Sequence, residues 1–398
     1  MTIYLDHNAT TVTRPSVISL MAEVMGETGN ASSVHQSGQT ARRRVETARR
    51  QIGKALCARP EDIVFTGTGT EALNLALSSL AAGGETRRLI VSAIEHEAVA
   101  ETAQRTGLEI EIWPVNAAGV VELDWLADRL MRWTTEDGVP ALALMRANNE
   151  IGTLQPVAQA AAMIREHGGR VVMDAIQAVG KVPLDLAEIG ADYVALAGHK
   201  FGGPQGSGAL VMACHAPLKR QIHGGGQESN RRAGTLNVAG IAGLGLAVEE
   251  AVAQLDAFQT LAGKRDRIEM ALGQLGAGIQ ILGEGAERLP NTLGVAVAGW
   301  RGETQVMAMD LAGVAISAGS ACSSGKARSS KMGTALDLPA EMADGVVRIS
   351  LGRTTTDAEV DAFIAAYREA HARIRPARLT DTHLTDTHRD TAAASVRG

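Results

Sequence analysis

Three segments of this sequence carry side chains that could act in one reaction, and two of them end an apolar run. Lys200 follows the apolar run 192–197 and precedes a turn rich in glycine and proline. A lysine at the carboxyl end of a buried strand can lose its proton and attack a carbonyl carbon. Asp174 ends a second apolar run, 171–173, and a buried carboxylate requires a cationic partner. Segment 66–70, Thr-Gly-Thr-Gly-Thr, offers backbone N–H groups at the start of an expected helix, where a phosphate can bind.

Together these groups predict a pyridoxal phosphate site, with a phosphate anchor, a carboxylate for the ring nitrogen and an amine for a Schiff base. Gln177 lies close behind Asp174 in the sequence and could donate a hydrogen bond there. Each feature alone has a commoner interpretation: a surface turn for Lys200 and a helix cap for Asp174. Segment 66–70 lacks the Gly-Lys-Ser/Thr ending of a nucleotide-binding loop. The hypothesis therefore depends on the features occurring together.

The three cysteines, at positions 57, 214 and 322, are too few and too scattered for a disulfide framework or a zinc site. Free thiols are typical of a reducing cytoplasm. Cys57 and Cys214 are predicted to be small buried apolar residues. Cys322 instead lies in a loop of serines and glycines beside Lys326. A cysteine on a polar loop near basic residues can be a reactive thiolate.

Short apolar runs that alternate with helical patterns must position these groups. Strands are expected at 63–65, 89–92, 109–113, 141–145, 171–174, 193–197 and 208–212. This alternation predicts an α/β fold with a mostly parallel, seven-stranded sheet that helices cover on both faces. A long amphipathic helical stretch begins near residue 238, and a smaller α+β unit follows residue 290. We expect a large domain, 15–245, and a small domain made of 1–14 and 246–375.

Charge and hydropathy narrow the class of protein. The net charge of -6 argues against nucleic acid as a direct partner. The first residues do not resemble a signal peptide, and no apolar run is long enough to span a bilayer. A cytoplasmic enzyme without a membrane partner is therefore expected. A polar pentapeptide repeats after residue 378, and 376–398 is predicted to be a disordered tail.

The chain resembles the cysteine desulfurases of the NifS/IscS type, in the class V aminotransferase group of fold-type I pyridoxal phosphate enzymes. The resemblance extends from residue 4 to about residue 372. It rests on the combination of YLDHNATT at 4–11, FTGTGTEALN at 65–74, EHEAV at 95–99, NNEIGTLQP at 148–156, DAIQAVGK at 174–181, AGHK at 197–200, HGGGQE at 223–228, RAGT at 232–235, SAGSACSSG at 317–325 and RISLGR at 348–353.

The resemblance implies a role for each matching residue. Lys200 would form the Schiff base, His96 would stack on the pyridine ring and shuttle protons, and Cys322 would be the nucleophile. The cofactor would be pyridoxal 5'-phosphate, bound by Gly69, Thr70, His96, Asn149, Asp174, Gln177, Gly198, His199, Lys200 and Thr235. Thr235 would reach the phosphate of a second subunit, which implies a homodimer. The substrate would be bound by Arg348, which clamps its carboxylate, and by Asn8 and Asn149.

The activity that the resemblance implies is conversion of L-cysteine to L-alanine, with the sulfur held as a persulfide on Cys322. The sulfur would pass to an acceptor such as an iron–sulfur scaffold or a tRNA thiolation protein. No resident metal is expected, although Cys322 could transiently ligate an iron–sulfur cluster. The chain departs from the family at Ala197, where a serine that binds the phosphate is usual, and at Thr68, where glycine is frequent.

Two alternatives stay open at this point. One is another class V enzyme, an aminotransferase or a selenocysteine lyase; Cys322 argues against transamination, which needs no thiol. The other is a sulfur carrier with a relic cofactor site, against which Lys200, Asp174 and His96 argue.

Overall fold

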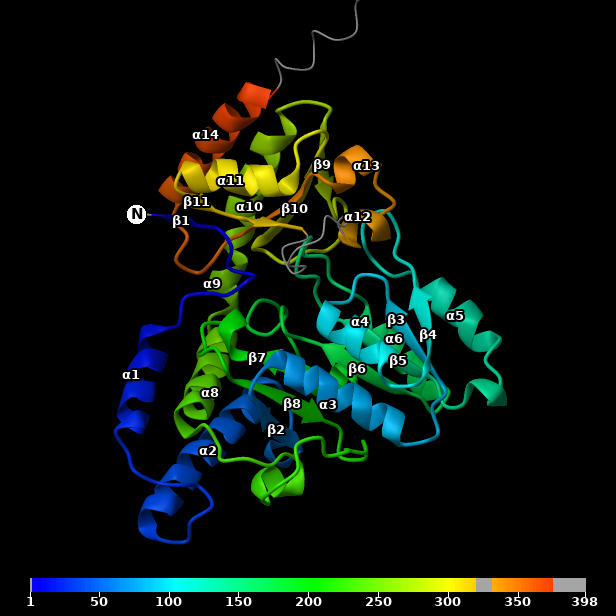
Figure 1. Ribbon diagram of the computed structural model, residues 1–398, viewed down its shortest axis with the longest axis vertical. Coiled ribbons are helices and arrows are strands. Elements are labelled where there is room, and N and C mark those ends of the chain that lie inside the picture. The colour runs from blue at the N-terminus through cyan, green and yellow to red at the C-terminus, as the bar shows by residue number, and fades with distance from the viewer. Residues whose placement is uncertain (1, 320–330, 375–398) are drawn as a thin grey trace, which may run out of the picture.

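The computed structural model describes residues 2–319 and 331–374. Cys322 and the predicted tail, 376–398, lie outside the described residues. The ribbon shows a large sheet with its helices below a smaller sheet, with the amino-terminal strand beside the smaller one (Figure 1). This arrangement is an α/β fold in which two sheets meet over the candidate site.

The large sheet has seven strands in the order β2-β8-β7-β6-β5-β3-β4. Their bounds are β2 Ile63–Thr66, β3 Arg88–Ser92, β4 Glu109–Trp113, β5 Ala141–Met145, β6 Arg170–Asp174, β7 Tyr193–Ala197 and β8 Gly208–Met212. β8 is antiparallel to both of its neighbours, and the other strands run parallel to one another. The prediction of a mostly parallel, seven-stranded sheet is confirmed.

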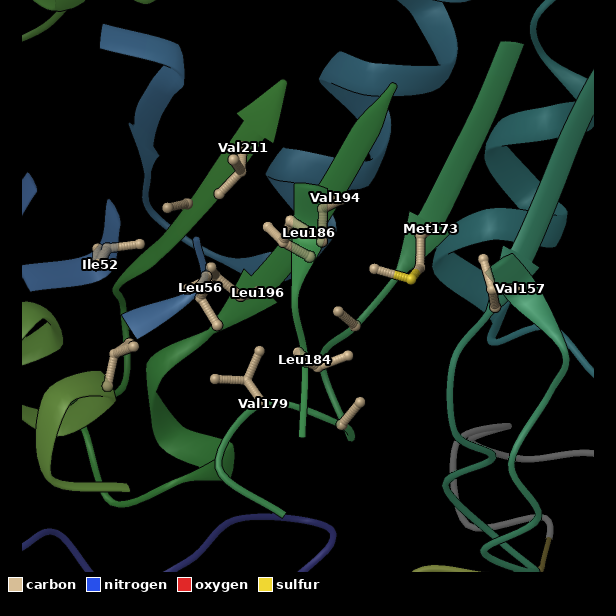
Figure 2. Close-up of a cluster of buried hydrophobic side chains, with 14 of the residues drawn as sticks. Ile52, Leu56, Val157, Met173, Val179, Leu184, Leu186, Val194, Leu196 and Val211 are labelled. Carbon is tan, nitrogen blue, oxygen red and sulfur yellow. The ribbon is translucent and has the colours of Figure 1, made fainter. Parts of the chain in front are cut away.

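Helices cover both faces of this sheet. Successive residues of a strand point to opposite faces, and on each face they join a separate apolar cluster. In β6, Val171 and Met173 belong to one cluster and Val172 to the other. α3 Gly69–Ala82 and α4 Glu97–Gln104 cover the face of Val172. The opposite face is covered by α1 Pro15–Met25, α2 Gln36–Ala55, α5 Leu123–Met131, α6 Val157–Glu166, α7 Leu186–Ile189 and α8 Val238–Ala253. Figure 2 shows part of the core on this opposite face, where strand residues lie near Ile52 of α2 and Leu56, which directly follows that helix. Each such side chain contributes about 1.5–3 kcal/mol when fully buried.

The second sheet is antiparallel, in the order β12-β13-β10-β9. Its strands are β9 Ile279–Leu282, β10 Thr292–Val297, β12 Ser317–Ala318 and β13 Val346–Ser350. The helices of this unit are α10 Leu261–Gly273, α11 Gly302–Leu311, α12 Lys331–Ala335, α13 Ala340–Ala343 and α14 Asp357–Ile374. β1 Ile3–Tyr4 pairs with β11 Val314–Ala315 and so ties the amino-terminal arm to this unit. The division into 15–245 and 1–14 with 246–375 stays a prediction, which this pairing supports.

The helical stretch expected from residue 238 is broken into three helices: α8, α9 Leu255–Gln259 and α10. Its two long parts are bent by 68°. Among the described residues no single helix has the length and hydropathy of a membrane span, and this bent pair is the one combination that passes by length and composition. Many residues of α8 are buried in the protein core, including Ile241, Leu244 and Val248.

Candidate active site

Five parallel strands of the large sheet end at one edge, and the segments after them carry most of the predicted site residues. β2 leads to Gly69 and Thr70, β3 to His96, β5 to Asn149, β6 to Asp174 and Gln177, and β7 to Gly198, His199 and Lys200. The carboxyl ends of parallel strands form the usual ligand-binding edge of an α/β sheet. The structure thus brings together residues that are up to 131 positions apart, from Gly69 to Lys200.

The expected phosphate anchor is the start of α3. Thr68 is its N-cap and accepts a hydrogen bond from the Glu71 N–H at 3.0 Å through Oγ1. The N–H groups of Gly69 and Thr70 are in the first turn, where a helix provides no carbonyl partner. A Cβ at Gly69 would lie 2.4 Å from Ile176 Cδ1, so a side chain there would require Ile176 to move. Thr68, the departure from the family pattern, therefore stabilises the helix end that would hold an anion.

Ala197 is the second departure, and its position predicts an effect on cofactor affinity. A Cβ at Gly69 would lie 3.1 Å from Ala197 Cβ, so Ala197 faces the start of α3. Ala197→Ser would add a hydroxyl donor beside the phosphate. A charge-assisted hydrogen bond contributes roughly 1.5–3 kcal/mol, and we expect tighter pyridoxal phosphate binding by about one order of magnitude or more. Cofactor retention on dialysis and the Kd measure this; unchanged or weaker binding in a variant of normal melting temperature would contradict it.

Asp174 is the last residue of β6 and is buried. Burial raises the pKa of its carboxyl to about 6, although the Ile176 N–H, at 2.8 Å from Oδ1, and the charge of Lys200 lower that pKa. The carboxylate form therefore lacks a full counter-charge in the protein alone. A protonated pyridine nitrogen beside Asp174 would supply that charge and keep the carboxylate ionised.

Lys200 contacts the amino-terminal arm, with Nζ donating to Asn8 O at 2.6 Å and to Ala9 O at 2.8 Å. Its charge also acts on its neighbours in the site. Burial and, to a smaller extent, the charges of Lys200 and Lys181 lower the pKa of His199 to about 4. Burial and the same Lys200 charge lower the pKa of His96. Lys200 is thus close enough to both imidazoles to favour their neutral forms.

His96 is the N-cap of α4, and its ring has a defined hydrogen-bonding role. The Ala98 N–H donates to His96 Nδ1 at 3.0 Å. A neutral imidazole that accepts at Nδ1 carries its proton on Nε2. His96 can therefore offer an N–H on its far side and, once that proton has left, can take one back there.

Arg348 reaches the site from β13 of the second sheet and is buried. Its Nη1 donates to Asn149 O at 3.1 Å, and its Nη2 donates to Asp6 Oδ1 at 2.5 Å. Its Nε is buried without a hydrogen-bond partner in the described part of the chain. An unpaired N–H on a buried guanidinium suits a carboxylate ligand, for which arginine provides a planar fork.

Asn8 is more buried than a residue at a substrate mouth would be, with 1% of its surface exposed. Its Nδ2 donates to Asn149 O at 3.2 Å and to Thr292 Oγ1 at 2.8 Å, and its backbone N–H donates to Ser350 Oγ at 2.9 Å. In this structure Asn8 joins the strand ends of the large sheet to the second sheet. Its predicted contact with substrate stays a prediction.

The remaining predicted residues are not brought to this edge by any described contact. Thr235 is exposed, in the loop before α8. Its neighbour Arg232 pairs with Glu71 of α3 at 2.8 Å, so the loop runs near the phosphate anchor of its own chain.

The prediction that Cys57 and Cys214 are buried is wrong, because both are exposed free thiols. Cys57 has a positive φ of 54° just beyond the end of α2, a turn position that apolar content alone does not reveal.

Three residues at the site were not predicted: Asp6, Glu95 and Lys181. Asp6 and Glu95 lie beside Asn8 and His96 in quoted motifs, so adjacency was the available signal. Lys181 follows Gln177 by four residues, a spacing that places both side chains on one side of a helical turn.

Burial raises the pKa of the Glu95 carboxyl to about 8, and its Oε1 accepts from Ser92 Oγ and from the Met145 N–H. Glu95 is therefore held mainly in its neutral form.

These residues fit pyridoxal 5'-phosphate on observations of the protein itself. The start of α3 suits the phosphate, the buried Asp174 suits the ring nitrogen, and Lys200 suits the aldehyde carbon. Among the described residues no group of three or more His, Cys, Asp or Glu side chains could hold a metal ion.

Comparisons with known proteins agree with this geometry. Residues 3–363 match the family model described as aminotransferase class-V. The chain is 37% identical over 366 residues to cysteine desulfurase IscS of Dictyoglomus turgidum, covering 90% of this chain and 92% of the relative. It is 38% identical over 390 residues to an IscS-like cysteine desulfurase of Mycobacterium tuberculosis, covering 94% and 98%.

Solved structures agree as well. A NifS-like protein superposes with a TM-score of 0.86 at 34% identity, covering 94% of this chain and all of the other. Family members use pyridoxal 5'-phosphate, in line with the strand-end groups above. The chain belongs to the class V aminotransferase family and, within it, to the cysteine desulfurases related to IscS and NifS.

Proposed function

We propose that this protein is a pyridoxal-phosphate-dependent cysteine desulfurase that converts L-cysteine to L-alanine and holds the sulfur as a persulfide on Cys322. The observation that carries the proposal is the convergence of Lys200, His96 and Asp174 at one sheet edge, with Arg348 facing that edge from the second sheet. The family relationship narrows this general amino-acid site to cysteine.

Each residue has a task that follows from its contacts. Arg348 holds the substrate carboxylate through its unpaired Nε–H and its Nη groups. Lys200 Nζ, once it has no covalent bond, takes the α-proton of the substrate and returns it. Asp174 keeps the ring nitrogen protonated, and His96 presents Nε2 as a proton donor. The bound cofactor supplies an electron sink for the bonds at the α-carbon.

The sulfur step balances without an external oxidant or reductant. The Cys322 thiolate attacks the substrate Sγ; the Cβ–Sγ bond breaks and an Sγ–Sγ bond forms. The electron pair of the broken bond stays on Cβ, which then binds a proton, so alanine leaves and the persulfide remains. An acceptor thiolate can take the terminal sulfur by attack on the persulfide. We propose an iron–sulfur scaffold or a tRNA thiolation protein as the acceptor.

We further propose that the enzyme is a cytoplasmic homodimer. The exposed free thiols Cys57 and Cys214 suit a reducing compartment. The exposure of Thr235 leaves its hydroxyl accessible to a second subunit.

A hybrid-dimer experiment tests the role of Thr235. Thr235→Val keeps the side-chain shape but removes the hydroxyl, and Lys200→Ala removes the amine; each homodimer should have little or reduced activity. If Thr235 serves the site of the other subunit, a mixed dimer contains one intact site, and activity should rise after subunits are mixed and exchanged. No rise, with hybrids demonstrated by native mass spectrometry, or an active monomer would contradict the proposal.

The function itself is tested by incubating the holoenzyme with L-cysteine and measuring alanine and sulfide, with and without an acceptor thiol. Equal molar alanine and transferable sulfur are expected. Production of pyruvate or of a transaminated cofactor in place of alanine would favour the aminotransferase or lyase alternative. Parallel assays with L-selenocysteine determine which chalcogen is preferred.

A further inference from the structure

A second lysine, Lys181, lies inside the site and has no role in the scheme above. It is buried, with 3% of its surface exposed, in the turn after β6. Its Nζ donates to Asn8 Oδ1 at 2.8 Å and to Gln177 Oε1. Both acceptors are uncharged carboxamide oxygens, which is an unusual setting for a buried lysine.

The charged groups around Lys181 do not favour a cation. Burial lowers the pKa of Lys181 well below its usual value, and the charges of Lys200 and Arg348 lower it further. The effect is mutual, because a charge on Lys181 would lower the pKa of His7 and of His199. A neutral amine has two N–H groups, and the two carboxamide oxygens accept both.

The two hydrogen bonds that Lys181 donates determine how the amides of Asn8 and Gln177 lie in this structure. A carboxamide has an acceptor oxygen on one side and a donor NH2 on the other. Because Lys181 occupies both oxygens, both NH2 groups face away from it. Gln177 Nε2 donates one N–H to Asn8 O at 2.9 Å, which leaves its second N–H for another acceptor. The orientation of Asn8 is supported independently by Asn291 Nδ2, which donates to Asn8 Oδ1 at 3.2 Å.

We propose that Lys181 is a positioning residue that fixes the amide of Gln177 with an N–H facing the cofactor ring and holds Asn8 across the two sheets. The inference rests on the proposed function, because it assigns the Gln177 N–H to the ring oxygen of pyridoxal phosphate. Without Lys181 the Gln177 amide loses the donor to its oxygen and keeps the bond from Nε2 to Asn8 O, so it can turn more easily and present its oxygen to an oxygen of the ring, which is repulsive. Lys181 acts through Gln177 and does not itself touch the reacting atoms.

The test is a double-mutant cycle between Lys181→Met and Gln177→Ala, read by pyridoxal phosphate Kd and by the visible spectrum of the bound cofactor. Methionine keeps an unbranched apolar chain of similar length and removes the donors. Lys181→Met should weaken cofactor binding about tenfold, the effect of one hydrogen bond, and change the pH midpoint of the visible band. In the Gln177→Ala background the same substitution should weaken binding less than about twofold, because the residue it orients is gone.

Lys264→Met is the matched control. Lys264 is partly buried, and its Nζ donates to Thr355 O at 2.6 Å and pairs with Asp357 at 3.6 Å, neither of which is a predicted site residue. It should leave the Kd and the spectrum unchanged. An equal tenfold loss in both backgrounds, an equal loss in the control, or an unchanged Kd and spectrum in folded Lys181→Met would each overturn the proposal.

Two further measurements keep the test decisive. If Lys181→Met does not fold, Lys181→Leu can be used, because leucine also removes the N–H donors. Weakened cofactor binding is expected in that variant, and wild-type affinity and spectrum would overturn the proposal. Alanine formation by the wild type is measured separately. A wild type that forms no alanine would refute the proposed function. The cofactor Kd and spectrum test the positioning role of Lys181 without any substrate, so the two failures can be distinguished.

Discussion

Lys200→Ala is expected to abolish alanine formation and the visible absorbance of lysine-bound cofactor. The substitution removes the one amine that β7 and its following turn bring to the sheet edge beside Asp174 and His199. It also removes the group that moves the α-proton, an effect of roughly 10²–10⁴ by itself. Loss of covalent binding adds to this, so residual turnover should be undetectable in a standard alanine assay. Lys264→Ala is the control with normal activity.

The same variant has a second, independent signature in the protein without cofactor. The charge of Lys200 lowers the pKa of His96 and of His199, which is about 4. Removing that charge should raise both pKa values toward the ordinary histidine range, although burial still lowers them. NMR titration of the imidazole resonances measures the change. Retained turnover or unchanged histidine titration would show that Lys200 is not at the centre of this site.

The large sheet was predictable from sequence because most of its strands are short apolar runs buried on both faces, and its edge strand β4 alternates charged and apolar residues over the first four of its five positions. All seven expected strands are present, and their bounds differ from the expected ones by one residue at most. β9 was missed because the edge strand Ile279–Leu282 has only four residues, too few to show either a continuous apolar run or a clear alternation. The division of 238–273 was missed because neither Gln254 nor Thr260, where the helices meet, is a glycine or a proline. Tertiary contacts fix that break, including the bond from Arg14 Nη1 to Gln254 Oε1 at 2.6 Å.

The candidate site was predictable in part, because some of its residues directly follow the apolar runs that predict the strands. Strand-end groups such as Asp174 and Lys200 stand beside recognisable apolar runs, and the family resemblance named their neighbours. The links across the two sheets could not be found this way, because Asn8 bonds to Ser350, a residue 342 positions away. Pairings at such distances depend on topology rather than local pattern, and they include the Arg348–Asp6 pair. The polar network that aligns the site is therefore the part that only the fold could reveal.

Cys322→Ser should nearly abolish alanine formation while the protein keeps its fold, its cofactor and its yellow colour. The cofactor-binding groups identified above are on other segments, and a serine hydroxyl is a far poorer nucleophile toward sulfur than a thiolate. L-cysteine should still change the visible spectrum on mixing, because Lys200 and Arg348 are intact. A loss of about 10³ or more in turnover is expected for removal of an essential nucleophile.

The other two cysteines provide matched controls for this variant. Both are exposed, so reagents and acceptors can reach them as free thiols. The Asp185 carboxylate, through a hydrogen bond with the thiol, raises the pKa of Cys57 and makes it a weaker source of thiolate. Cys57→Ser and Cys214→Ser should therefore keep near-normal turnover. Mass spectrometry of wild-type protein treated with L-cysteine should place the extra sulfur on the peptide that contains Cys322. A persulfide confined to Cys57 or Cys214, or full activity in Cys322→Ser, would favour an aminotransferase or lyase, in which no thiol of the protein attacks the substrate.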